Sequence, residues 1–529
     1  MAFCENCGAK LADSAIFCEN CGAKVESDEP PKIVSETVGA DASDAFTVFA
    51  DRNWRERWRQ AAQAASECEL GLIVTRERKL TEALSEEDPA PFRECVGRYI
   101  SAAKQRGVAY HYLNLEILSV ESDLQSNLSI LRQIVEVARP KYLFLIGNAG
   151  VMAVGTWENE ACDDDQEVDG DLPYAILDAT SPWEGQSFDF KDSLRVGRLP
   201  NADDDDLVSF RRYFDYAAEH IGKTGTIVPY GLSALVWQDE SQEVFSHISD
   251  NEVDVSPEFS VDEHGDGFEN ANLLYFNLHG GEGSECWYGQ DDAYYPSAFD
   301  PWMMTEVAAP HYIGVEACYG AQYDCSVDES ILLTALRSGC LAFLGSSKIA
   351  YGTPEPEGSC ADIIVGEYIR EIADGKCAGD ALVTGRRRLT ASDLLDDSDI
   401  KTLAEFSLYG DPSACTGKNP NLGAAKCLMK GFLGTSKGLH IPMPDVRRAT
   451  RLALAEVDAK ISAMVDSIVQ DQYLSKYGKG DLQISAKTFR LPALKLNQKI
   501  YSVESSVSKQ HIKVYFDDSG NIKKTCLSK

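Results

Sequence analysis

Residues 272–281 read NLLYFNLHGG, an apolar run that ends directly at His279 and Gly280. Residues 312–318 read YIGVEAC, a second apolar run that ends at Cys318. Short, continuous apolar runs are typical of parallel strands that are buried on both faces of a sheet. Because ligands bind beyond the carboxyl ends of such strands, we expect His279 and Cys318 to share one edge of a sheet.

The same pattern extends outward from these two segments. Between residues 46 and 417, short apolar runs such as GLIVT (71–75) and YLFLIG (142–147) alternate with amphipathic, helix-like stretches. This alternation predicts an α/β fold with doubly wound, mainly parallel sheets. Periodicity leaves open whether 46–222 and 223–417 form two sheets or one continuous unit.

Two further regions flank this α/β body. Residues 26–45 are acidic, contain a pair of prolines and predict a flexible linker. Residues 438–529 combine a helix-like pattern at 443–471 with strand-like runs after residue 480. They predict a small α+β module at the C-terminal end.

The first 25 residues contain a repeat, since FCENCGAK occurs at 3–10 and again at 17–24. Each copy holds a C-x2-C pair, and four thiolates suit tetrahedral zinc. The predicted ligands are Cys4, Cys7, Cys18 and Cys21. A closed four-cysteine site leaves no open coordination position, so we expect a structural Zn²⁺ in a zinc ribbon over 1–25. A redox pair or a disulfide framework is the alternative.

Composition limits the possible partners and compartment. The 529 residues carry a formal net charge of −34, which disfavours non-specific nucleic-acid binding and can attract basic peptides. No apolar stretch long enough for a transmembrane helix occurs, and the N-terminus does not resemble a secretory signal. A cytoplasmic location is therefore expected, where the 16 cysteines serve as metal ligands, catalytic groups or small buried residues.

The two strand-end residues suggest nucleophilic chemistry. A thiol needs a neighbouring base or imidazolium to become a useful nucleophile near neutral pH, and His279 is the candidate partner of Cys318. Gly280 has no side chain to block a substrate carbonyl, so its N–H can join that of Cys318 in an oxyanion hole. Alternatively, His279 is a strand-end residue and Cys318 a buried core thiol.

Several motifs along the chain resemble one family of peptidases. NLHGG followed by VEACYGA is similar to the caspases, legumain, separase and gingipains. Further segments resemble the gingipain-like members in the same order along the chain: YLFLIGN (142–148), DLPYAILD (171–178), SLRVGRLP (193–200), ALRSGCLAFLGSS (335–347) and FSLYGDPS (406–413). The resemblance covers roughly residues 65–415.

This resemblance implies a caspase/gingipain-like fold with Cys318 as nucleophile and His279 as catalytic histidine. It also implies that Gly280 and Cys318 donate the oxyanion N–H groups. Asp171 falls where arginine-cleaving members place the acid of the P1 pocket, and Glu316 could line the same pocket. The alternative for Asp171 is an exposed acid in a very acidic loop.

The sequence departs from the family pattern at Gly147–Asn148, where the family has Gly-Asp. A third residue that orients the histidine is therefore not assigned.

The expected activity is cysteine endopeptidase cleavage after Arg, or Lys, without an organic cofactor. The expected setting is a regulated intracellular protease whose zinc ribbon binds a regulatory protein. One alternative is a catalytically inactive caspase-fold scaffold that uses the zinc ribbon for protein binding. Another is a cysteine acyl transferase such as a transpeptidase.

Overall fold

The structure, a computed structural model, describes two main parts of the chain and two short strands near the N-terminus. The described residues are 2–3, 10–11, 54–64, 68–416 with gaps at 162, 185–187, 221–224, 292–293, 354–357 and 392–394, and 482–529 with gaps at 492–495, 506–510 and 517–521. The predicted linker at 26–45 and the helix-like segment at 443–471 lie outside them.

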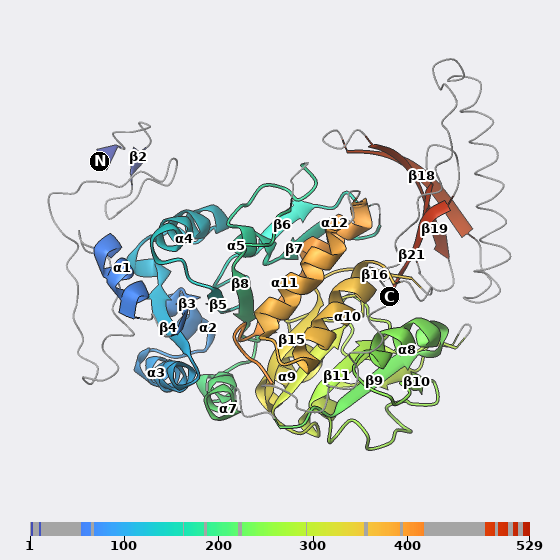
Figure 1. The fold of residues 1–529 in the computed structure, drawn as a ribbon, viewed down its shortest axis with the longest axis horizontal. Coiled ribbons are helices and arrows are strands. Elements are labelled where there is room, and N and C mark those ends of the chain that lie inside the picture. The colour runs from blue at the N-terminus through green and yellow to red at the C-terminus, as the bar shows by residue number, and fades with distance from the viewer. Residues whose placement is uncertain are drawn as a thin grey trace, which may run out of the picture.

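One ten-stranded sheet spans the α/β body, in the order β10-β9-β11-β14-β15-β17-β8-β5-β3-β4 (Figure 1). In chain order its strands are β3 (Glu69–Thr75), β4 (Val108–Asn114), β5 (Tyr142–Ile146), β8 (Arg195–Leu199), β9 (Pro229–Ala234), β10 (Asp254–Ser256), β11 (Leu273–Asn277), β14 (His311–Val315), β15 (Cys340–Ser346) and β17 (Phe406–Gly410). Residues 46–222 and 223–417 thus contribute to one continuous sheet, which periodicity left open.

The sheet consists of two parallel blocks that run in opposite directions. Strands β4, β3, β5, β8 and β17 are parallel to one another, as are β15, β14, β11, β9 and β10. The blocks meet at the antiparallel pair β15 and β17, where Leu344 lies opposite Leu408. The expectation of a mainly parallel sheet is confirmed. Every residue of β5, β11 and β14 is buried, which explains their continuous apolar sequences.

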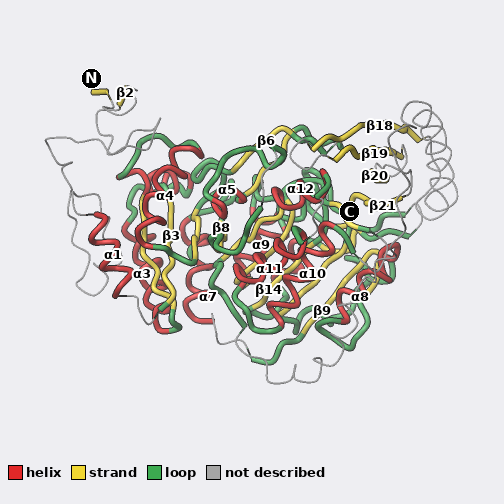
Figure 2. The backbone as a smooth tube through the Cα atoms, turned by 45° about the horizontal axis from the view of Figure 1, so that its top comes forward, coloured by secondary structure: helices red, strands yellow, loops and turns green. Residues whose placement is uncertain are grey.

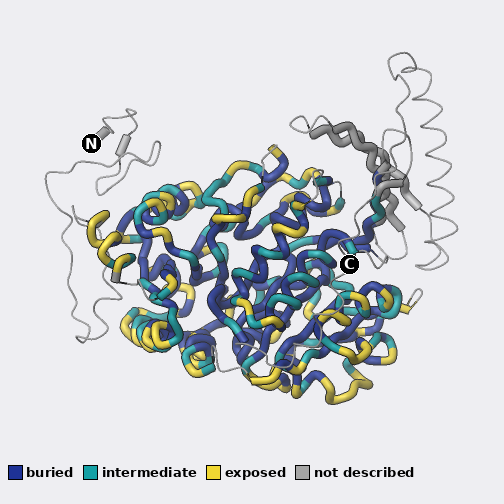
Figure 3. Tube along the Cα trace, in the orientation of Figure 1, coloured by how far each residue is buried: buried dark blue, intermediate teal, exposed yellow. Residues whose placement is uncertain are grey.

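Helices follow most strands and cover the sheet. They are α1 (Trp54–Ala64), α2 (Glu77–Ala83), α3 (Ala90–Gln105), α4 (Leu124–Ala138), α5 (Leu172–Ile176), α6 (Leu207–Phe210), α7 (Arg212–His220), α8 (Gln238–Ser246), α9 (Ile331–Ser338), α10 (Cys360–Ala373), α11 (Ala378–Leu389) and α12 (Asp397–Glu405). Short 3-10 turns are η1 (Leu115–Ile117), η2 (Leu235–Trp237), η3 (Pro301–Thr305) and η4 (Val327–Glu329). Burial is concentrated along the central strands, whereas exposed residues gather on the outer helices and loops (Figure 3).

The described residues also contain three short antiparallel pairs of strands outside this sheet. They pair β1 (Ala2–Phe3) with β2 (Lys10–Leu11), β6 (Gly155–Glu158) with β7 (Glu167–Gly170), and β12 (Trp287–Tyr288) with β13 (Ser297–Phe299). No described helix is long and apolar enough to cross a membrane.

A second sheet, five-stranded and antiparallel, lies at the end of the body that contains α8 and α10 (Figures 1 and 2). Its order is β16-β21-β20-β19-β18, with bounds β16 (Tyr351–Gly352), β18 (Leu482–Leu491), β19 (Leu496–Ser505), β20 (His511–Phe516) and β21 (Ile522–Ser528). Strand β16 belongs to the loop after β15, so one strand of this second sheet is supplied by the α/β body.

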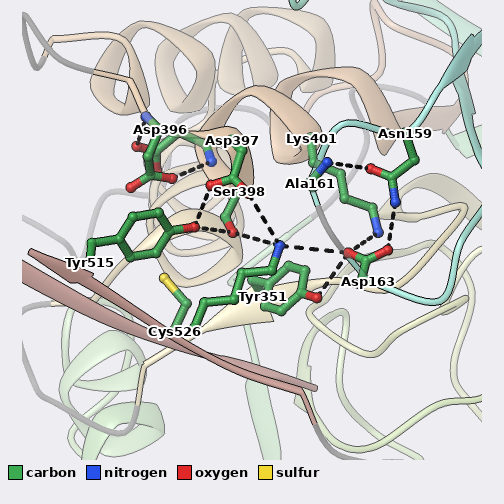
Figure 4. Close-up of polar contacts among 12 residues, drawn as sticks. Asn159, Ala161, Asp163, Tyr351, Asp396, Asp397, Ser398, Lys401, Tyr515 and Cys526 are labelled. Atoms are coloured by element: carbon green, nitrogen blue, oxygen red, sulfur yellow. Dashed lines mark hydrogen bonds and ion pairs between the residues drawn. The ribbon is translucent and has the colours of Figure 1, made fainter. Parts of the chain in front are cut away.

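Buried ion pairs hold these C-terminal strands on the body (Figure 4). Lys513 of β20 lies 3.7 Å from both Asp163 and Asp397, and all three side chains are fully buried. Asp163 also accepts hydrogen bonds from Lys401 at 2.8 Å and from the Tyr351 hydroxyl at 2.8 Å. A buried charge without its partner is strongly destabilising, so the pairing of Lys513 with these carboxylates fixes β20 against the body.

We expect Lys401→Met to lower the free energy of unfolding by about 3–5 kcal/mol, because it removes the ammonium partner of buried Asp165 and leaves Asp163 with only the more distant Lys513. Urea denaturation followed by tryptophan fluorescence measures the change. Arg78→Met is the matched control, because Arg78 pairs with Glu82 on the exposed surface. Its cost should stay below about 1 kcal/mol. Equal costs for the two variants would contradict the importance of the buried network.

Candidate active site

His279 and Cys318 lie at the same edge of the sheet. Strands β11 and β14 are adjacent and parallel, with Phe276 opposite Val315. Cys318 follows the end of β14 by three residues, and His279 follows the end of β11 by two. The parallel register therefore brings both loops to the carboxyl edge of the second block.

The backbones of Gly280 and Cys318 are in close contact. A Cβ atom on Gly280 would lie 1.9 Å from the carbonyl oxygen of Cys318, which is far inside van der Waals distance. Only glycine therefore fits beside this carbonyl. Among the described residues, neither the N–H of Gly280 nor that of Cys318 has a hydrogen-bond acceptor. Two such donors on adjacent loops suit the binding of an oxyanion.

The chain turns sharply after Cys318. Tyr319 has a φ of +50°, a left-handed conformation that is uncommon for a residue with a side chain. Its N–H donates to the Lys348 carbonyl at 2.8 Å, and its hydroxyl donates to Asp165. These bonds offset the local strain, and such strain is concentrated at functional sites.

His279 is packed among aromatic rings. Its ring centroid lies 4.3 Å from that of Trp237 and 5.2 Å from that of Tyr295. Its Nε2 atom is 2.7 Å from Oε1 of the buried Gln290. An amide oxygen only accepts, so a neutral imidazole carries its proton on Nε2 and keeps Nδ1 as the basic nitrogen. Burial lowers the pKa of His279 to about 4, so the ring is neutral near pH 7.

Cys318 is also in its neutral form. The thiol lies 3.5 Å from the Ala350 carbonyl oxygen, to which it donates. Burial raises the pKa of Cys318 well above that of an exposed thiol. Within the described part of the chain, the thiol and the His279 ring form no hydrogen bond with each other. His279 and Cys318 thus lie on neighbouring loops, and burial lowers the pKa of the imidazole and raises that of the thiol, which favours the neutral form of each.

Asp171 is engaged elsewhere. Its two carboxylate oxygens accept from Arg198 Nε and Nη2 at 2.8 and 2.6 Å, and both side chains are buried. Arg198 belongs to β8, which β17 and β15 separate from β14 in the sheet. The charge of Asp171 is therefore already paired. Asp171 is also not an exposed acid, which was the alternative.

Glu316 lies in a compact cluster of carboxylates. It is fully buried two residues before Cys318 and accepts from the Tyr275 hydroxyl at 2.8 Å. Glu240 in the first turn of α8 and Asp362 in the first turn of α10 join it, with one ligand atom of each within 4.8 Å of the others. Burial raises the pKa of both Glu240 and Glu316.

Glu240, Asp362 and Gln290 were missed by sequence reasoning. The two acids occupy the first turns of helices, where acids are common for capping, so no motif marks them. The predicted zinc ligands Cys4, Cys7, Cys18 and Cys21 lie outside the described residues.

We expect Cys318 to react slowly with iodoacetamide at pH 7.5, because the buried thiol is protonated. Its labelling rate should rise about tenfold per pH unit toward pH 10, as the thiolate fraction does below the pKa. Peptide mapping by mass spectrometry follows each cysteine separately. Cys286, which is not buried, is the internal reference and should label faster at pH 7.5. Rapid labelling of Cys318 at that pH would contradict this description.

A family model described as a zinc-ribbon domain matches residues 3–25, which supports zinc binding at the N-terminus. Among solved structures, the chain is similar to one called "Structure of Protease". The two share 13% sequence identity with a TM-score of 0.41, and the match covers 88% of this chain and 91% of that chain. A likeness this distant does not establish a shared activity. No curated protein matches the chain.

Proposed function

We propose that the protein is a cysteine endopeptidase of gingipain-like, caspase-like type, with Cys318 as nucleophile and His279 as its proton-transfer partner. The observation that carries this proposal is the position of both residues at one edge of the parallel sheet, beside two backbone N–H groups that have no acceptor among the described residues. Nucleophile, base and oxyanion donors are the three parts that acyl transfer requires.

The proposed reaction has two steps. The sulfur of Cys318 attacks the scissile carbonyl carbon, and the thiol proton passes to His279 and then to the leaving amine. Water next attacks the thioester, releasing the carboxylic acid and restoring the thiol. The N–H groups of Gly280 and Cys318 stabilise the oxyanion in both steps. Gln290 acts as a positioning residue, because its amide orients the imidazole in place of a carboxylate.

We assign selection of a basic P1 residue to the carboxylates beside the nucleophile. Glu316 is two residues from Cys318 and fully buried, so an ammonium or guanidinium beside it would be strongly favoured. Asp171, the sequence candidate for this role, instead has Arg198 as its partner. The proposed substrate is therefore a protein or peptide with Lys or Arg at P1.

The zinc ribbon and the C-terminal strands suit a regulated enzyme. We propose that residues 1–25 hold a structural Zn²⁺ and bind a regulatory protein, and that the enzyme acts in the cytoplasm. A catalytically inactive scaffold is the second candidate. It is favoured by one observation, the burial of the Cys318 thiol, which raises its pKa above that of an exposed thiol.

Incubation of the full chain with fluorogenic peptides bearing Lys, Arg, Asn or Asp at P1 tests the proposal. Cleavage after Lys or Arg should occur and should disappear in Cys318→Ala, with hydrolysis confirmed by product mass. Cleavage after Asn or Asp would support the peptidase activity and refute the proposed preference for a basic P1 residue. Failure of all four peptides, together with failure of a thiol-reactive lysyl probe to label Cys318, would favour the scaffold.

Gly280→Ala should lower kcat/KM at least 100-fold, because its Cβ would collide with the Cys318 carbonyl and displace an oxyanion donor. Gly281→Ala is the matched control, since the nearest atom to its Cβ would be 3.8 Å away. Its activity should stay within about threefold of wild type. Thermal unfolding of both variants separates a catalytic effect from loss of the fold. Equal activities would remove Gly280 from the mechanism.

A further inference from the structure

The carboxylate cluster beside Cys318 is occupied by Lys529, the last residue of the sequence. The Lys529 side chain is fully buried, and its Nζ lies 2.6 Å from Asp362 and 2.9 Å from Glu316. A third acceptor, Oδ1 of Asn277, is 3.0 Å away, and Glu240 lies at 3.7 Å. The ammonium thus donates hydrogen bonds to Glu316 and Asn277 and forms a close ion pair with Asp362.

The walls of this pocket also suit a lysine side chain. The Trp237 ring lies 4.8 Å from Nζ, within the range of a cation–π contact. A Cβ atom on Gly352 would lie 2.0 Å from Cε of Lys529, so the stem of the lysine passes directly over this glycine. Burial opposes a charge on Lys529, but Asp362, Glu316 and Glu240 outweigh it and raise its pKa, so it remains an ammonium.

The backbone that carries Lys529 approaches the catalytic thiol in an extended form. Strand β21 pairs antiparallel with β16, with Leu527 opposite Gly352 and Ser528 opposite Tyr351. The N–H of Lys529 then donates to the Ala350 carbonyl at 3.0 Å. This is the oxygen that accepts from Cys318 Sγ at 3.5 Å. An added strand with its last side chain in a pocket is a known mode of peptide recognition.

We propose that Glu240, Glu316, Asp362 and Asn277 form a lysine-selective P1 pocket, and that the chain's own C-terminal strand occupies it as a substrate-like inhibitor. The proposal rests on the peptidase function proposed above and names its substrate class and its regulation. In this arrangement Lys529 takes the P1 position, Ser528 P2 and Leu527 P3. An external substrate reaches Cys318 only after this segment leaves.

The pocket favours lysine over arginine for a geometric reason. Its acceptors converge on one nitrogen atom, which suits the compact ammonium. A guanidinium spreads five donors over a planar fork, and Gly352 and Trp237 leave a narrow passage for the stem. The Lys side chain is therefore expected to be preferred at P1.

The resident strand is anchored beyond the pocket as well. Lys524, on the same strand, lies 2.8 Å from Asp396 and 2.7 Å from Asp399. Leu527 is buried, and Cys526 pairs with Lys513 of β20. These contacts fix the register of the segment against the body. Lys529 therefore lies in the pocket whenever the C-terminal sheet is bound to the body.

The first experiment tests the pocket by refilling it. Lys529→Ala removes the three carbons and the ammonium beyond Cβ, which n-propylammonium supplies. Millimolar n-propylammonium should raise the thermal midpoint of Lys529→Ala by several degrees and leave wild type unchanged. Propan-1-ol should have no effect on either protein, and the guanidinium analogue should be weaker. In the full chain carrying both Lys529→Ala and Glu316→Gln, the amine effect should disappear.

The second experiment tests inhibition. Lys529→Ala should cleave a Lys-P1 peptide with a kcat/KM at least tenfold above wild type and prefer it to the Arg-P1 peptide. The gain should be lost when Gly352→Ala is added, because a methyl group there fills the passage. Should Lys529→Ala not fold, Lys529→Gln carries the same comparison, since it also removes the ammonium.

The two experiments separate the possible failures. Amine binding without any peptide cleavage would keep the lysine pocket and overturn the peptidase. Cleavage that is independent of Lys529 and of the P1 residue would keep the peptidase and overturn the pocket. Stabilisation of Lys529→Ala by Ca²⁺ but not by the amine would replace the proposal with a metal site.

Discussion

The antiparallel pairing of β15 with β17 is the constraint on which the architecture depends. It joins two five-stranded parallel blocks into one sheet while keeping their carboxyl edges apart. Loops from the second block therefore converge beyond β11 and β14, and the turn between β6 and β7 joins them through Asp165, which accepts from the Tyr319 hydroxyl. His279 and Cys318 lie at that edge, and the loop after β15 pairs with the C-terminal strands through β16 and β21.

Much of this architecture follows from local sequence patterns. Continuous apolar runs identify β3, β5, β11 and β14 because each of these strands is almost wholly buried. The positions of His279 and Cys318 follow from the rule that parallel strands present their carboxyl ends together. The pairing of β17 with β15 was not predictable, because three helices intervene and no local pattern records which strands become neighbours.

The candidate site was predictable only in part, for the same reason. Its chemical groups adjoin apolar strands, but their electrostatic partners come from distant segments. Nothing near Asp171 marks Arg198 as its partner, although both lie in segments that sequence reasoning had singled out. Likewise, the carboxylates around Glu316 come from two helix starts, and their counter-ion is 213 residues further along the chain. Charge pairing of this kind depends on tertiary packing rather than on spacing.

The docking of the C-terminal strands by lysines has a consequence for solubility. Lys513, Lys524 and Lys529 all enter carboxylate-lined positions on an otherwise acidic body. If the strands separate from the body, the lysines and the carboxylates that they contact are exposed as charged, readily hydrated groups. An interface made only of apolar side chains would instead expose a hydrophobic patch that promotes aggregation. Strands held by charged groups can therefore separate and dock again repeatedly in water. Because salt screens the exposed charges, the attraction that brings the separated strands back weakens as the ionic strength rises.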